Sequence, residues 1–215
     1  MNPTRALLSL FLIATILTGC VSQDMVITPR YAGPDKVPVS RMAAHMQYRG
    51  FAILKPEDMR WYSKFGEQSS YVALFRFEPL SDTHTFFASV RNTRIAISPR
   101  NVDEFKSYVD TNVTRFGPRY ELISYESRIV RIQGQLAIHY KVKFWDKAAQ
   151  GTEEPLVTSI VGFDVIHPAW DRTVISASYS QRGKKDELSD SLDKAGEDFL
   201  SRIVLESSPG VKIDG

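Results

Sequence analysis

Alternating apolar and polar positions run through the middle of the chain and predict β-strands. The clearest alternation lies within residues 135–145, where large apolar residues occupy the even positions from 136 to 144 and small or basic residues the odd positions from 137 to 143. A period of two is typical of a strand with one dry and one wet face. Aromatic and β-branched runs predict further strands at 71–77, 85–91, 95–97, 127–132, 156–166 and 173–180.

The apolar period changes to that of a helix in two places. Val102, Phe105 and Val109 share one helical face, and Asn101 with Glu104 three residues later has the pattern of a helix start. The second helix is expected over residues 186–205, whose apolar stripe is Leu188, Leu192, Ala195, Phe199 and Ile203. Gly196 lies inside this second helix, where glycine costs about 1 kcal/mol relative to alanine. Its presence predicts close packing of the helix on the sheet.

Strands, a helix, a longer run of strands and a final helix predict an α+β fold, an antiparallel sheet flanked by helices. The residues behind a more specific interpretation are the segment 50–56 ahead of Trp61, the helix over 102–116, and Tyr179-Ser180 before the last helix. This arrangement resembles the PsbP-like fold, which bacterial lipoproteins of unassigned function share. The resemblance implies an α/β/α sandwich and brings no catalytic signature with it.

The first twenty residues differ from the rest of the chain. Arg5 precedes a dozen almost unbroken apolar residues, too few for the roughly 20 that a membrane-spanning helix needs. The run is typical of the core of an export signal, and it ends in Leu17-Thr18-Gly19-Cys20. This ending resembles the lipobox of bacterial lipoproteins. The resemblance implies cleavage between Gly19 and Cys20 and lipidation of Cys20, with acyl chains such as palmitate anchoring the chain in a membrane.

The rest of the chain divides into three parts by composition. Residues 20–40 contain Pro29, Pro34 and Pro38 and are expected to be the lipidated N-terminus and a flexible tether, with an edge strand packed on the domain as the alternative. Residues 41–207 are expected to form a single globular domain, and residues 208–215 a polar tail. Val21, rather than an aspartate, follows Cys20, so the lipoprotein resemblance implies the periplasmic face of the outer membrane, with the inner membrane as the alternative.

The composition excludes several classes of function. The 27 Lys and Arg residues against 25 Asp and Glu leave no surplus of positive charge for a dedicated nucleic-acid binder. The single cysteine excludes an intrachain disulfide and a cysteine metal cluster. None of the common nucleotide-binding, zinc-protease, EF-hand or hydrolase motifs occurs, and the four histidines lack the paired spacing of zinc ligands. We therefore expect no cofactor, no metal and no catalytic residue of a recognised type.

One strand face carries a candidate binding surface. His139, Lys141 and Lys143 share the polar face of the strand over 135–145. They predict a basic surface patch that binds phosphate groups of lipids or an acidic partner. The alternative is a polar strand face that is covered by a helix or paired with carboxylates.

These features together favour a non-enzymatic binding or accessory module of the cell envelope. The membrane would be reached through the acyl chains on Cys20, and the partner would be an envelope protein, a lipid or a cell-wall component. Two alternatives stay open. One is an envelope hydrolase without a recognised motif, built on residues such as Asp164 and His167. The other is a carrier of an apolar ligand held between the sheet and a helix.

Overall fold

A computed structural model describes the fold of most of the chain after the N-terminal segment. The described residues are 37–38, 44–55, 61–63, 71–76, 83–96, 98–149, 152–188 and 191–206. The signal peptide, Gly19, Cys20 and the C-terminal tail lie outside them, and so does the tether except for Val37-Pro38.

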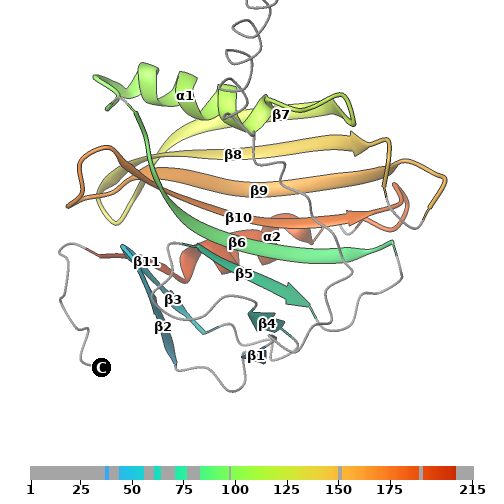
Figure 1. Ribbon diagram of the computed structural model, residues 1–215, viewed down its shortest axis with the longest axis horizontal. Coiled ribbons are helices and arrows are strands. Elements are labelled where there is room, and N and C mark those ends of the chain that lie inside the picture. Colours follow the sequence, from blue (N-terminus) through green and yellow to red (C-terminus); the bar gives the residue numbers. More distant parts are fainter. Residues whose placement is uncertain are drawn as a thin grey trace, which may run out of the picture.

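Eight strands form one antiparallel sheet, the large sheet (Figure 1). Their order across it is β1 (Val37–Pro38), β4 (Trp61–Ser63), β5 (Tyr71–Arg76), β6 (Thr85–Arg94), β10 (Thr173–Gly183), β9 (Leu156–Ile166), β8 (Gln135–Asp146) and β7 (Tyr120–Ile132). A second, three-stranded sheet has the order β11 (Ile203–Leu205), β3 (Phe51–Leu54) and β2 (His45–Tyr48).

Helix α1 (Val102–Thr114) packs on one face of the large sheet, along β7 and β8 (Figure 1). The Oδ1 atom of Asn101 accepts a hydrogen bond from the Glu104 amide at 2.9 Å, which confirms the helix start expected from the sequence. Phe105 and Val109 are fully buried against the even-numbered side chains of β8, which are Ile138, Tyr140, Val142 and Phe144. We call this side of the large sheet the α1 face.

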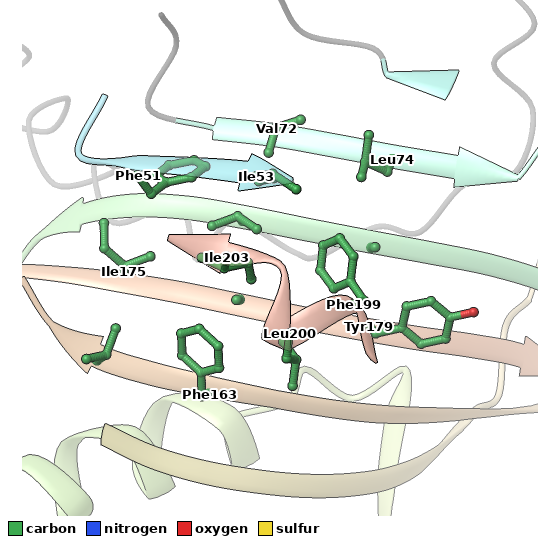
Figure 2. Packing of buried hydrophobic residues seen from close by; sticks show 14 of the residues in the cluster. Phe51, Ile53, Val72, Leu74, Phe163, Ile175, Tyr179, Phe199, Leu200 and Ile203 are labelled. Carbon is green, nitrogen blue, oxygen red and sulfur yellow. The ribbon is translucent and has the colours of Figure 1, made fainter. Parts of the chain in front are cut away.

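Helix α2 (Leu192–Ser201) and the three-stranded sheet cover the opposite side, the α2 face. Figure 2 shows Phe199, Leu200 and Ile203 pointing toward Phe163, Ile175 and Tyr179 of the large sheet. The close packing predicted at Gly196 is confirmed, because a Cβ atom added there would lie 1.9 Å from Cγ1 of Val161. The sequence-based fold class, an antiparallel sheet flanked by helices, is therefore confirmed.

Several element boundaries differ from those expected. Strand β7 begins at Tyr120 rather than at residue 127, and its register with β8 shifts between Leu122 and Ser124, which interrupts the alternation. The final helix begins at Leu192 rather than at residue 186, and it ends at Ser201 rather than at 205, because Ile203–Leu205 pairs with β3 as strand β11. Strand β6 runs on to Arg94 rather than ending at residue 91, and Ile95 and Ala96, where a separate strand was expected over 95–97, lie outside any strand.

The segment expected to be a tether contributes one short strand. Val37 and Pro38 pair with Ser63 and Tyr62, so β1 forms the outer strand of the large sheet at that end. This pairing agrees with the alternative in which part of the segment packs on the domain edge. The division into signal peptide, tether, domain and tail otherwise stays a prediction.

Candidate functional site

Four polar residues lie side by side across the α1 face, one from each of four neighbouring strands. The register pairs Tyr71 of β5 with Arg91 of β6, Arg91 with Ser176 of β10, and Ser176 with Asp164 of β9. Directly opposed residues in antiparallel strands have their Cβ atoms about 5 Å apart and point to the same face. We call these four residues the polar row.

Asp164 is the most deeply placed member of the polar row, with 6% of its surface exposed. Its carboxylate accepts a hydrogen bond from the Ser176 side chain. Burial raises the pKa of Asp164 to about 6, against the opposing effects of this hydrogen bond and of the Arg91 charge. The carboxyl group therefore changes its ionisation at mildly acidic pH.

Arg91 lies on the far side of Ser176 from Asp164, and its side chain is exposed. Among the ion pairs of the described part of the chain, none involves Arg91. An exposed guanidinium group and a buried carboxyl group thus lie two strands apart on one face. Together they offer a hydrogen-bond donor and an acceptor to a molecule lying across β10.

Tyrosine rings lie at both ends of the polar row, with Tyr71 itself the member at one end. Tyr108 of α1 is half-buried, and burial together with the Asp164 charge raises the pKa of its phenol. Tyr140 of β8 is buried, and its phenol pKa is raised by the same two causes. At the other end, burial raises the pKa of the Tyr71 phenol, against the effect of the Arg91 charge. All three phenols stay neutral at ordinary pH and can both donate and accept hydrogen bonds.

The next row of residues carries only short side chains. Ala73, Ser89, Ser178 and Gly162 pair in turn across β5, β6, β10 and β9. The hydroxyl oxygens of Ser89 and Ser178 lie 3.2 Å apart. The α1 face therefore carries two serine hydroxyl groups beside the polar row. The four side chains of this second row are all too short to cover the polar row.

Asp110 fastens α1 to the edge of the sheet and thereby sets the position of Tyr108. Its carboxylate accepts hydrogen bonds from the Tyr125 hydroxyl at 2.6 Å, the Ser127 hydroxyl at 2.8 Å and Lys106 Nζ at 2.6 Å. Burial alone would raise the pKa of Asp110, but these three hydrogen bonds outweigh it and hold the pKa below its usual value.

The basic residues expected to form a surface patch lie on the α2 face of β8. His139 is buried, and its Nε2 atom lies 2.8 Å from a carboxylate oxygen of Glu197. Lys141 Nζ donates to Asp193 at 2.5 Å, which raises the pKa of the lysine. Two of the three residues, His139 and Lys141, thus face carboxylates of α2, while Lys143 is exposed. That this face binds a partner stays a prediction.

Asp164 and His167, the residues suggested for a hydrolase, are not brought together. Nε2 of His167 donates to the Gly50 carbonyl at 3.0 Å, and Nδ1 accepts from the amides of Ala169 and Trp170 at 3.1 and 3.0 Å. Burial lowers the pKa of His167, which keeps the ring neutral in this role. His167 therefore fastens the β9–β10 connection to the turn between β2 and β3, while Asp164 faces the other side of the sheet.

A second buried charge cluster lies at the far end of the large sheet. Its residues are far apart in the sequence, and no local pattern predicted that they would meet. Arg119 donates two hydrogen bonds to Asp146, at 2.5 and 2.6 Å, and Nη1 of Arg182 lies 3.8 Å from the same carboxylate. Asp146 and Arg182 are both nearly fully buried. The bidentate geometry is typical of a structural ion pair that joins β8 to the loop before β7.

Two features are absent from the described part of the chain. It contains no group of three or more His, Cys, Asp or Glu residues placed to hold a metal ion. None of its helices has the length and apolar character needed to cross a membrane. The cleavage and lipidation residues, Gly19 and Cys20, lie outside the described residues.

Solved structures of two proteins are among those that resemble this chain. No protein-family model and no curated protein matches the sequence. A crystal structure of LpqN, described as involved in cell envelope biogenesis of Mycobacterium tuberculosis, has 10% identity and a TM-score of 0.45, covering 79% of this chain and 90% of its own. A solution structure of PsbP from the cyanobacterium Synechocystis has 14% identity and a TM-score of 0.37, covering 73% of this chain and 87% of its own. That the fold is PsbP-like stays a prediction.

Proposed function

We propose that the chain is a lipid-anchored module of the cell envelope that binds a hydroxyl-rich ligand, a cell-wall glycan, across the α1 face. The observation that carries this proposal is the polar row, in which exposed Arg91 and buried Asp164 flank Ser176. The protein would stand on the periplasmic face of the outer membrane, held there by acyl chains on Cys20. More than one such chain is needed for stable anchoring.

The chemistry of the polar row supports a sugar rather than an apolar ligand. A sugar hydroxyl both donates and accepts, so one hydroxyl can accept from Arg91 while a neighbouring one donates to Asp164. Hydroxyl groups of Ser89 and Ser178 lie in the adjacent row, and Tyr71 and Tyr108 add aromatic surface with a polar tip. A few convergent polar groups beside aromatic side chains are the usual composition of a small-molecule site.

Two separate observations argue against the two other candidate functions, the carrier of an apolar ligand and the hydrolase. An apolar ligand between the sheet and α2 would need space where Val161 already lies within contact of Gly196. A hydrolase built on Asp164 and His167 would need the two groups within hydrogen-bond reach of one nucleophile. Each of them instead makes its hydrogen bonds on a different side of the large sheet.

Calorimetric titration of the full-length chain in mild detergent, with soluble peptidoglycan fragments as the probe, tests the binding function. We expect the wild type to bind without releasing cleaved product, and Arg91→Ala and Asp164→Asn each to weaken binding at least about tenfold. Arg94→Ala is the matched control, because Arg94 is an exposed arginine of the same strand whose side chain lies on the opposite face. Binding by Arg91→Ala at the wild-type affinity, or no binding by the wild type, would overturn the proposal.

The anchor is tested separately by Cys20→Ala. Loss of the thiol removes the attachment point for the acyl chains, so we expect the exported variant to appear in the soluble fraction of the envelope. The matched control is Ser22→Ala, which keeps the cysteine and changes a nearby small polar residue. A Cys20→Ala protein that stays with the membrane after export would show that something else anchors the chain.

A further inference from the structure

Strand β7 ends the large sheet on one side, and its outer edge carries the exposed large hydrophobic residues of the described chain. These are Leu122, Ile123 and Ile129, with 44, 44 and 49% of their surface exposed. Within the described residues, β7 pairs with β8 alone. A long edge strand with exposed apolar side chains is a template for pairing with another strand.

The direction of the free backbone groups of β7 follows from its turn to β8. Gln133 and Gly134 both have positive φ, 49° and 81°, so they form a two-residue turn of the type that joins hairpin strands. Ile132 and Gln135 are therefore the first hydrogen-bonded pair, and such pairs alternate along the hairpin. Consequently the amides and carbonyls of Tyr125, Ser127 and Ile129 point outward, away from β8.

The charges on β7 are arranged so that the strand complements itself. Glu126 and Arg128 are both exposed, lie on the same face, and flank Ser127. Glu126 is within only 4.0 Å of Lys141, and Arg128 makes no ion pair within the described part of the chain. Charges on an edge strand commonly oppose pairing, but here an antiparallel copy centred on Ser127 brings opposite signs together.

We propose that β7 pairs with β7 of a second copy of this chain, antiparallel and centred on Ser127. In this register Ser127 lies opposite Ser127 of the second copy. On either side of it, Tyr125 of one copy lies opposite Ile129 of the other. These three pairs are hydrogen-bonded through the outward backbone groups. Glu126 faces Arg128 twice as non-hydrogen-bonded pairs, the kind in which opposed side chains lie closest. The exposed Ile129 is then covered by the partner's Tyr125, and the two large sheets become continuous.

A register shifted by one residue does not bring the outward backbone groups of the two strands opposite one another, since it sets outward groups of one strand against inward groups of the other. A two-residue shift that centres the pairing on Glu126 keeps the outward backbone groups matched but places two carboxylates opposite one another, which is unfavourable. The bulge between Leu122 and Ser124 limits regular pairing to Ser124–Val130. The proposal is independent of the ligand on the polar row.

Sedimentation of the full-length chain in detergent micelles, with charge-reversal variants, tests this interface. We expect a dimer for the wild type, and a dissociation constant raised at least about tenfold by Glu126→Arg or by Arg128→Glu, because each places like charges opposite one another. The double variant Glu126→Arg/Arg128→Glu restores opposite signs and should restore the dimer. A monomeric wild type, or a dimer that both single variants leave unchanged, would refute the pairing.

A disulfide test fixes the register. Ser127→Cys should crosslink two copies in isolated membranes under mild oxidation, because the paired Cα atoms would lie about 5.5 Å apart, within disulfide range. Ser124→Cys is the matched control, since residue 124 faces 130 in this register and should not crosslink. The wild type, whose only cysteine is Cys20, gives the background. Crosslinking at 124 rather than 127, or to a different protein, would overturn the proposal.

Discussion

Gly162 of β9 lies directly beneath the ring of Tyr140 of β8. A Cβ atom added at Gly162 would lie 2.7 Å from both Cζ and the hydroxyl oxygen of Tyr140, and 2.6 Å from the backbone oxygen of Ala177. No side chain fits there without a shift of the ring or of β10. The missing side chain thus allows the Tyr140 hydroxyl to lie over the sheet beside the polar row.

We expect Gly162→Ala to lower the free energy of unfolding by about 1–3 kcal/mol, because one contact is with backbone that cannot move away. Chemical denaturation followed by circular dichroism measures the change. Gly117→Ala is the control, since a Cβ atom there meets nothing within 4 Å, and it should leave stability nearly unchanged. Equal stabilities of the two variants would mean that the ring of Tyr140 is not held over Gly162.

Asp164 should make the stability of the protein depend on pH. Its pKa in the folded state, about 6, lies above its value in an unfolded chain, so protonation favours the folded state. The free energy of unfolding attributable to this residue therefore falls as the pH rises from about 4 to 6, by roughly 3 kcal/mol, and is constant above that range.

Denaturation midpoints of the wild type and of Asp164→Asn between pH 4 and 8 measure this effect. The asparagine variant carries no charge at any pH, so its stability relative to the wild type should increase through the same range and be greatest above pH 6. Asp171→Asn, at an exposed carboxylate near the same strands, is the control. A constant difference between Asp164→Asn and the wild type would show that Asp164 is not protonated on folding.

The sequence predicted the parts of the fold whose signals are local. The alternation over 135–145 and the Asn101 cap each depend on neighbouring residues, and both were confirmed. Strand β11 was missed because Ile203–Leu205 continues an apolar helical stripe and becomes a strand only through pairing with β3. The polar row was missed because Tyr71, Arg91, Ser176 and Asp164 come together only through the strand order β5-β6-β10-β9. A carboxylate inside the apolar strand 156–166, Asp164, was the one local signal of this site.

Gly196 and Val161 should be energetically coupled across the α2 face. Gly196→Ala forces the buried Val161 side chain out of its position, and we expect a loss of about 1–3 kcal/mol despite the better helix propensity of alanine. Val161→Ala alone removes buried methyl groups and should cost roughly 2 kcal/mol. In the double variant the new methyl group occupies the vacated space, so its loss should be smaller than the sum.

A double-mutant cycle from denaturation curves gives the coupling, which we expect to be about 1–2 kcal/mol in favour of the double variant. Ala195→Gly/Val161→Ala serves as the control cycle, because Ala195 neighbours Gly196 on the helix but is only partly buried. Additive effects in the Gly196 cycle would contradict the close approach of α2 to β9.

Asp146 should be the most sensitive ionisable residue at the far end of the sheet. Replacing it by alanine leaves Arg119 and the buried Arg182 without the carboxylate that both approach, and removal of one partner from a buried charge cluster commonly costs about 3–5 kcal/mol. Thermal and chemical denaturation measure the loss. Glu121→Ala, which breaks the exposed contact between Glu121 and Lys147, is the control and should cost no more than about 1 kcal/mol. An equal loss of stability in Asp146→Ala and Glu121→Ala would contradict this prediction. It would require water to solvate the Arg182 charge, although only 3% of that side chain is exposed.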